Sequence, residues 1–493
     1  MSTPPTPPAV SAPTPSDRLI TSQHTVTVAG RQLSYTATTG YIILKEESEK
    51  KHEGGGFPPG EQPRAQIFFT AYTLNDQPNL AERPITFAFN GGPGSASVWL
   101  HLGLLGPRRV LFDDNGMPLP PPYRLVENDQ TLLDLTDLVF IDPVSTGYSR
   151  SIPGEPAATF HGFKKDIESV GDFIRLYTTR YGRWASPKYL AGESYGTTRA
   201  AGLSGYLQQR HGMYLNGLIL ISAVLNFQTL EFDDGNDLPY ILFLPTYAAT
   251  AWYHQRLRAE YQRRSLRELL DEVEAFALGE YASALIRGTT LANNERARIA
   301  RRIAGYTGLS VDYVERSHLR IRDMRFFKQL LHGDGRTAGR LDSRYAAIEP
   351  DSLSQEFFDP SMAAIMGPYT ACLYQYIRGD LGFESDLPYE IISERVYPWS
   401  YAQHENKYVN VAETLRHAML INPHLRVYVA SGYYDLATPH FATDYTFNHL
   451  NLTPAQRQQV QISYFEAGHM MYIHQPSLLR LRQDLACFLN NIP

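Results

Sequence analysis

The first apolar runs of the chain are typical of β-strands. "GYIILKEE" and "AQIFFTAYTLND" are rich in β-prone residues, and the segment between them, "SEKKHEGGGFPPGEQPR", contains the Gly and Pro residues that mark an exposed loop. We therefore expect a β-hairpin here. Two further apolar runs, Ile85–Phe89 and Leu138–Ile141, end at "NGGPGS" and "DPVSTGYS". Each of these runs predicts a strand that stops at a turn.

Helical and strand patterns then alternate. Between Phe163 and Tyr177 the apolar residues recur at helical spacing, which predicts a helix with one buried face. "KYLAGESYGTTRAAGLSGYL" predicts a short strand followed by a helix, whereas "LRVYVASGYYD" and "QQVQISYFEAGHM" predict strands that lead into loops. A last helix is expected from about Ser477 to Leu489, after Pro476. This alternation predicts an α/β fold, with helices flanking a mostly parallel central sheet.

The middle of the chain has a different pattern. Residues 251–286 and 293–308 are strongly helical, and few strand patterns occur between Phe227 and Ser400. We therefore expect a large helical insertion, or lid, at residues 228–400. It would divide the α/β core into a first part, residues 21–227, and a second part, residues 401–493. Residues 1–20 are rich in Pro, Thr and Ser and predict a disordered tail.

Composition narrows the class of protein. The 493 residues carry a net charge of −6, with 43% hydrophobic and 19% charged residues, as in soluble globular proteins. There is no basic run with interleaved aromatic residues to predict nucleic-acid binding, and no apolar run approaches the roughly 20 residues of a membrane span. The two cysteines, Cys372 and Cys487, lie outside any zinc-binding spacing. The first residues lack the pattern of a signal peptide, so a cytoplasmic location is expected, and the oligomeric state stays open.

Ser194 is the first candidate for chemistry. It is the centre of a G-x-S-x-G match, Gly192 to Gly196, between a predicted strand and a predicted helix. A nucleophile elbow needs this position, with glycines where side chains would clash in the sharp turn. The same letters also fit a tight strand-to-helix turn with a capping serine, so the motif alone leaves both readings open.

Asp435 and His469 favour the catalytic interpretation. A serine hydroxyl needs a base to take its proton, and the base needs a carboxylate to hold its tautomer. Asp435 and His469 each follow a predicted strand, in the chain order Ser, Asp, His that α/β-hydrolases use. Either residue alone would more often be structural. Together the three predict a catalytic triad.

Two backbone amides are candidates for an oxyanion hole. One belongs to Tyr195, the residue after the proposed nucleophile, and the other belongs to the loop after an early strand. "NGGPGS" supplies such a loop, in which Gly91 and Gly92 let the backbone approach a substrate closely. We expect Gly92 to be the second donor.

The sequence resembles the serine carboxypeptidase family of the α/β-hydrolase superfamily, as a divergent member poor in cysteine. The resemblance rests on "TGYIIL…FFTAYTLND", "NGGPGSAS…LGP", "VFIDPVSTGYS", "AGESYG" and "SGYYDLATP…AGHM". It implies the α/β-hydrolase fold, a serine-type carboxypeptidase that works through an acyl-enzyme, and a peptide substrate with a free C-terminus. It implies no metal or other cofactor. The residues that match the family's carboxylate-binding positions are Asn90, Gly91 and Glu193.

The resemblance also implies a protonated Glu193, because a charged glutamate would repel a substrate carboxylate, and hence activity at acidic pH. The family usually has a tryptophan at the position of Ala88 and an acidic partner for the elbow glutamate at the position of Leu104. These departures leave a second enzyme class open, an esterase or acyltransferase with the same triad. A non-catalytic binding protein of the same fold is a further alternative.

Overall fold

The computed structural model describes residues 15–48, 60–349, 351 and 358–490. Most of the predicted tail, residues 1–14, and most of the predicted hairpin loop, residues 49–59, lie outside the described residues. The first strand, β1, spans Arg18–Val28 and pairs with the next strand from Arg18 onward. The predicted tail, residues 1–20, therefore extends three residues too far, because residues 18–20 already belong to a sheet.

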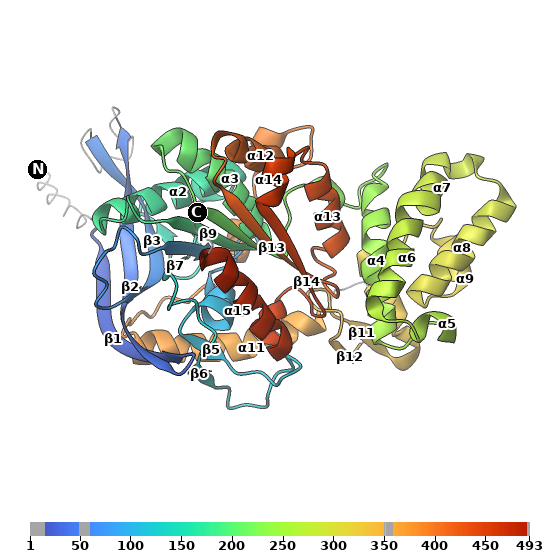
Figure 1. The fold of residues 1–493 in the computed structure, drawn as a ribbon, viewed down its shortest axis with the longest axis horizontal. Helices are drawn as coiled ribbons and strands as arrows, with labels where there is room; N and C mark the ends of the chain where they lie inside the picture. The colour runs from blue at the N-terminus through green and yellow to red at the C-terminus, as the bar shows by residue number, and fades with distance from the viewer. Residues whose placement is uncertain (1–14, 49–59, 350, 352–357, 491–493) are drawn as a thin grey trace, which may run out of the picture.

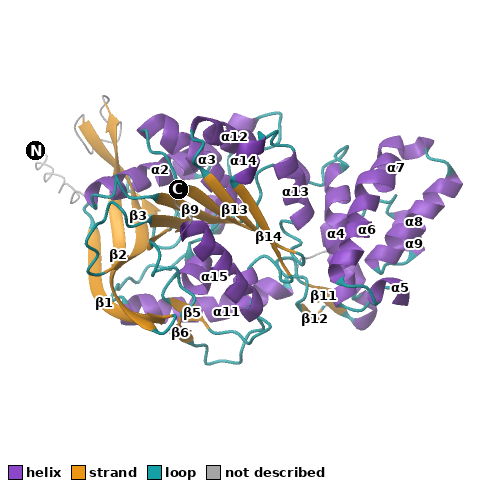
Figure 2. Cartoon of the chain, viewed as in Figure 1, coloured by secondary structure: helices purple, strands orange, loops and turns teal. Residues whose placement is uncertain are grey.

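A ten-stranded sheet forms the centre of the described structure (Figures 1 and 2). Its first three strands pair antiparallel with one another, and from β7 onward the strands run parallel, as predicted. In spatial order the strands are β1, β2 (Arg31–Ser48), β3 (Gly60–Leu74), β7 (Asp137–Ile141), β4 (Ile85–Phe89), β9 (Lys188–Glu193), β10 (Gly217–Ile221), β13 (Arg426–Gly432) and β14 (Val460–Phe465), with β8 (Arg150–Ser151) paired to β3.

Helices cover both faces of this sheet, which confirms the predicted layer arrangement. One face packs against α2 (Phe163–Arg180), α3 (Tyr195–His211) and α12 (Ala412–Ile421). The other face packs against α1 (Val98–Leu100), the π-helical turn η1 (His101–Leu105), α11 (Pro360–Gln375), the short turn η10 (Met471–Ile473) and α15 (Gln475–Asn490). Strands β4, β7 and β10 are buried along their whole length, because helices lie on both sides.

A helical lobe lies beside the sheet and has its own hydrophobic core (Figure 1). It packs on α13 (His440–Asn448), and Tyr434 and Leu436 of the core join its apolar cluster. The lobe contains α4 (Leu238–Tyr253), α5 (Ala259–Gln262), α6 (Leu266–Phe276), α7 (Ala282–Arg287), α8 (Asn293–Thr307), α9 (Val311–Arg316), α10 (Asp323–Leu330) and the hairpin of β11 (Arg336–Ala338) and β12 (Ala346–Ile348).

The predicted insertion, residues 228–400, is too long at its C-terminal end. Helix α11 packs under the sheet rather than in the lobe, where the rings of Trp99 and Tyr369 lie 4.8 Å apart. Its apolar positions indicate that one face is buried, but periodicity alone does not reveal which neighbour buries it. No helix within the described residues is long and apolar enough to cross a membrane.

Candidate active site

Ser194 lies at the turn between β9 and α3, with φ 60° and ψ −131°. This conformation is unusual for a residue with a side chain, and structures retain it where the surroundings enforce it. The Ser194 amide donates a 3.0 Å hydrogen bond to the Ile221 carbonyl of β10. A Cβ atom at Gly192 would overlap the Gly196 carbonyl oxygen, so the turn closes only with glycines there. The sharp turn expected for a nucleophile elbow is therefore present.

Asp435 and His469 lie on the loops after β13 and β14 and contact each other directly. His469 Nδ1 and Asp435 Oδ2 are 2.7 Å apart, and both side chains are buried. The other carboxylate oxygen of Asp435 accepts hydrogen bonds from the amides of Ala437 and Thr438, at 2.8 and 2.9 Å. The Thr438 hydroxyl adds a 2.7 Å bond to Oδ2. The carboxyl group is thus held in place and oriented toward the imidazole.

The environment of His469 favours its charged form. Burial lowers the pKa of the imidazole, but the charge of Asp435 and the hydrogen bond to it, together with the charge of Glu193, raise the pKa above its ordinary value. The main chain of His469 is fixed as well, because the Ser222 hydroxyl donates a 2.7 Å bond to its carbonyl. An imidazole with this environment is suited to accept a proton and to hold it as an imidazolium.

The glycine loop after β4 reaches the Ser194 turn. Gly92 has φ +100°, a conformation that favours glycine. A Cβ atom at Gly91 would overlap the backbone nitrogen of Tyr195, so the two segments touch. Tyr195 is the first residue of α3, and its N–H has no acceptor within the helix. The backbones of Gly92 and Tyr195 are therefore brought to one side of Ser194.

A buried ion pair joins these two segments. Arg199 of α3 is 1% exposed and forms a 2.8 Å salt bridge with Asp166 of α2. Its Nη1 donates a 2.5 Å hydrogen bond to the Asn90 carbonyl, and the Tyr195 hydroxyl donates to Asp166 Oδ2 at 3.3 Å. Arg199 and Asp166 thus fix the glycine loop relative to α3.

Glu193 is buried next to the Ser194 turn and is bonded to a tyrosine. The Tyr472 hydroxyl donates a 2.6 Å hydrogen bond to Glu193 Oε2. Burial raises the pKa of Glu193 to about 7, although the charge of His469 and the hydrogen bond from Tyr472 act in the opposite direction. Leu104, which occupies the position of the family's usual acidic partner, is buried in the apolar core. The carboxyl group of Glu193 is therefore protonated below neutral pH without an acidic partner at position 104.

Two cavities meet at Ser194. The smaller has a volume of about 150 Å³, and its apolar walls include Trp99, Met362, Ile365, Ile392 and Met470. The larger has a volume of about 810 Å³ and lies toward the helical lobe, with aromatic side chains and the exposed acids Glu231 and Asp233 in its lining. The residues that line both cavities are Gly92, Ser194, Arg340 and Leu341.

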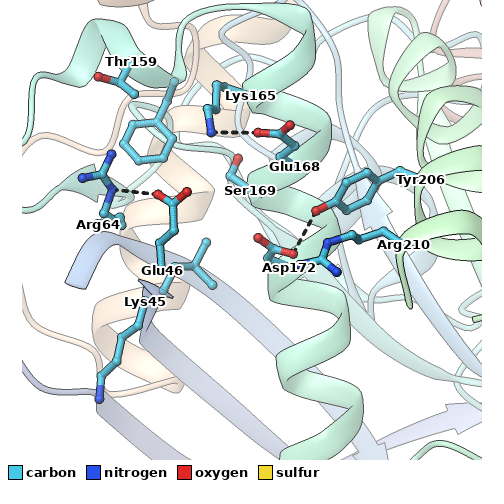
Figure 3. A pocket seen from close by; sticks show the side chains of 12 residues that line it. Lys45, Glu46, Arg64, Thr159, Lys165, Glu168, Ser169, Asp172, Tyr206 and Arg210 are labelled. Carbon is cyan, nitrogen blue, oxygen red and sulfur yellow. Dashed lines mark hydrogen bonds and ion pairs between the residues drawn. The ribbon is translucent and has the colours of Figure 1, made fainter. Parts of the chain in front are cut away.

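A further cavity of about 340 Å³ lies between β2, α2 and α3 (Figure 3). Its charged side chains largely bind one another: Lys165 and Glu168 are 2.8 Å apart, and Arg64 and Glu46 are 3.2 Å apart. Ser194, Asp435 and His469 do not line it. We therefore place the candidate site at the two cavities that meet at Ser194.

The structure brings the predicted site residues together. Asn90, Gly91, Gly92, Glu193, Ser194 and His469 line the smaller cavity, Tyr195 lines the larger one, and Asp435 lies behind His469. Sequence reasoning missed Thr438, Tyr472, Arg199 and Asp166. Thr438 follows Asp435 by three residues, the spacing of a local side-chain cap, and that signal was available. The other three carry no local pattern that links them to the site.

Known proteins resemble this chain in sequence and in fold. The profile of the serine carboxypeptidase family matches residues 43–275. The pheromone-processing carboxypeptidase KEX1 of Saccharomyces cerevisiae is 29% identical over 163 residues, which cover 32% of this chain and 20% of that protein. KEX1 of Yarrowia lipolytica is 29% identical over 194 residues, which cover 38% of this chain and 26% of that protein. The matched stretches thus span only about a fifth to a quarter of the length of these curated relatives.

The similarity of fold extends further than the similarity of sequence. The crystal structure of KEX1(Δ)p, a prohormone-processing carboxypeptidase from Saccharomyces cerevisiae, superimposes with a TM-score of 0.51. The superposition covers 93% of this chain and 92% of that one, at 16% sequence identity. At this identity the superposition supports a common fold, and it includes the C-terminal part of the chain, which lies beyond the profile match.

Proposed function

Because the chain belongs to the serine carboxypeptidase family of the α/β-hydrolase superfamily, we propose that it hydrolyses C-terminal peptide bonds of peptides. The observation that carries this proposal is the convergence of a nucleophile, a base and a protonated carboxyl group on one small cavity. Ser194, His469 and Glu193 all line it. A peptidase that binds a free C-terminus and cleaves the last peptide bond needs the nucleophile and base within one residue's length of the group that binds the terminal carboxylate.

In the proposed reaction, Ser194 Oγ attacks the carbonyl carbon of the last peptide bond. His469 Nδ1 is engaged by Asp435, so Nε2 is the nitrogen that accepts the hydroxyl proton. The same proton then passes to the leaving amine, and a water molecule releases the acyl-enzyme by the reverse sequence.

The amides of Gly92 and Tyr195 are the proposed oxyanion hole. Both belong to the two backbone segments that touch beside Ser194. Removing one such donor in other serine hydrolases lowers kcat by about 10²–10³. This contribution requires that the two segments keep their relative position, which the Arg199–Asp166 pair supports.

Asn90, Gly91 and Glu193 are the proposed binding site for the substrate's terminal carboxylate. Asn90 Nδ2 is buried and has no hydrogen-bond partner among the described residues, so it is a free donor. Glu193 becomes a donor when it is protonated, and burial favours that form. A free carboxylate can accept hydrogen bonds from both Asn90 Nδ2 and the protonated Glu193. An ionised Glu193 would instead repel the carboxylate.

The two cavities then bind opposite sides of the scissile bond. The smaller cavity holds the carboxylate-binding groups and takes the C-terminal residue, and its apolar walls suit an apolar side chain. The larger cavity takes the residues that precede the bond.

Two measurements test this proposal. A fluorophosphonate probe should label the wild-type protein and should not label Ser194→Ala. Failure to label the wild type would exclude a serine hydrolase and leave the non-catalytic binding protein. N-blocked dipeptides with a free C-terminus should be hydrolysed much faster than their C-terminal amides, and Glu193→Ala should remove that preference. Equal rates on acid and amide would favour the esterase or acyltransferase alternative.

The pH dependence of activity is a third test of the proposal. Activity on the free-acid peptide should rise as His469 loses its proton and fall as Glu193 loses its own, near pH 7. The two groups titrate as a coupled pair, since each changes the pKa of the other. The amide substrate needs no protonated Glu193 and should lack the fall.

A further inference from the structure

The loop between β11 and β12, residues 339–345, leaves the helical lobe and runs between the two loops that carry Asp435 and His469. We call it the hairpin loop. The amide of His469 donates a 2.7 Å hydrogen bond to the Leu341 carbonyl, and the amide of Leu436 donates a 3.0 Å bond to the Arg340 carbonyl. Ser343 N in turn donates to the Tyr434 carbonyl at 2.9 Å. The hairpin loop is thus bonded on one side to the acid loop and on the other to the histidine loop.

Two side chains of the hairpin loop contact the histidine loop: Arg344 donates a 3.4 Å hydrogen bond to the Glu466 carbonyl, and Asp342 contacts Gly468. Asp342 is 4% exposed, and its Oδ2 accepts a 3.1 Å hydrogen bond from the amide of Gly468, the residue before His469. A Cβ atom at Gly468 would overlap Asp342, so the two residues pack without a gap. Through this hydrogen bond the side chain of Asp342 holds the backbone next to His469.

Arg344 fixes the carboxylate of Asp342. Its Nε lies 3.0 Å from Oδ1 and its Nη2 lies 2.7 Å from Oδ2, in the paired geometry that guanidinium and carboxylate groups favour. Arg344 is itself buried. The pair leaves Asp342 with one orientation, so the oxygen that receives the Gly468 amide cannot rotate away.

We propose that Asp342 is a positioning residue of the active site, which holds the histidine loop through the Gly468 amide so that His469 keeps its contact with Asp435 and its place beside Ser194. This inference rests on the proposed function, because it concerns the same three residues. Displacement of a catalytic group by about 1 Å can lower the rate about 100-fold. A buried amide that loses its acceptor also favours any shift of the loop that restores a hydrogen bond.

Three variants test the proposal. Asp342→Ala removes the acceptor, and Asp342→Asn keeps one oxygen for the Gly468 amide while it removes the charge. Asp237→Asn is the control, because Asp237 also forms a paired bridge, with Arg320 at 2.6 and 2.7 Å, in a more exposed place, and lines neither cavity at Ser194. Circular dichroism and a thermal melt of each variant establish that it is folded at the assay temperature.

A loss of positioning should appear in kcat and not in KM. We expect Asp342→Ala to lower kcat on a free-acid dipeptide about 100-fold, in line with a displaced catalytic base, with KM within about 3-fold of the wild type. Asp342→Asn should stay within about 10-fold of the wild type, because it retains the acceptor for the Gly468 amide. Asp237→Asn should match the wild type. A kcat for Asp342→Ala within twofold of the wild type, a change in KM alone, or an equal loss in Asp237→Asn would each overturn the proposal.

A second readout needs no substrate and separates this inference from the proposed function. The proton that His469 Nδ1 shares with Asp435 should give a low-field NMR resonance, assigned by its absence in His469→Gln. We expect Asp342→Ala to lose this resonance and Asp342→Asn and Asp237→Asn to keep it. Its persistence in Asp342→Ala would refute the positioning role, whereas a wild-type protein that shows it and fails to react with fluorophosphonate would refute only the proposed activity.

Discussion

The hydroxyl of Tyr472 donates a 2.6 Å hydrogen bond to the carboxyl group of Glu193, from a turn that begins only two residues after His469. A phenol therefore contacts the elbow glutamate, while Leu104, at the position of the family's usual acidic partner, lies in the apolar core. A tyrosine and an acid affect Glu193 differently. A phenol donates to the ionised carboxylate and stabilises it, whereas a second acid shares a proton with it.

Tyr472→Phe tests the role of this hydrogen bond. The bond lowers the pKa of Glu193 within an environment whose burial raises it to about 7. Its removal should raise that pKa further, so the alkaline fall in kcat/KM for a free-acid dipeptide should move to higher pH. The measurement is the pH profile of kcat/KM between pH 5 and about 9, the range in which such groups titrate. The C-terminal amide of the same peptide is the control and should show no such movement; a shift in both substrates would trace the effect to another group.

Glu193→Gln should change how stability depends on pH. The pKa of Glu193 in the folded protein is about 7, against an ordinary value of 4.5. The folded state therefore resists ionisation, and stability is lost as pH rises from the ordinary value to the folded value. The loss is about 3 kcal/mol for a shift of this size. We expect urea unfolding to show that the wild type loses about that much more free energy of unfolding than Glu193→Gln between pH 4.5 and pH 8. Parallel profiles would contradict the raised pKa.

Gly91→Ala should damage the proposed oxyanion hole. The added Cβ atom would overlap the Tyr195 amide nitrogen, so the glycine loop and α3 must separate. We expect kcat to fall about 10²–10³-fold, as when one oxyanion donor is lost. Gly279→Ala is the matched control, because a Cβ there meets no atom within 4 Å. Wild-type kcat in Gly91→Ala would show that the contact can relax without affecting the reaction.

Arg199→Met should destabilise the protein and loosen the same region. It leaves Asp166 buried without its cation, and burial already raises the pKa of Asp166. Removing one partner of a buried pair costs about 3–5 kcal/mol. Chemical denaturation should show this loss, and the double variant with Asp166→Asn should recover part of it because no charge remains buried. A loss below about 1 kcal/mol would indicate that water reaches Asp166.

Local patterns predicted the elements of the core well. The helical spacing between Phe163 and Tyr177 became α2, and the expected closing helix became α15, because each has an apolar face that packs on the sheet. The helices in the middle of the chain were harder to predict. Residues 251–286 have helical composition throughout, yet α4 ends at Tyr253 and short helices follow. Composition indicates helix formation, but the packing of the lobe decides where each helix ends.

The proposed triad could be found from sequence because Ser194, Asp435 and His469 each follow a strand, and parallel strands end at one edge of the sheet. Tyr472 and Arg199 could not be found in this way. Their partners, Glu193 and Asp166, are distant in sequence, and only the folded chain brings them together. Asp342 is a further case, because it comes from a segment that the sequence assigned to the lid.

The hairpin loop has a consequence for protein engineering. An engineer who wants to alter selectivity would trim the lobe from which it extends, or exchange it for the lobe of another hydrolase. Such a graft would also remove the brace between the acid and histidine loops, so the swapped enzyme would lose turnover along with its old preference. A chimera that retains residues 336–348 from this chain is the one to build first.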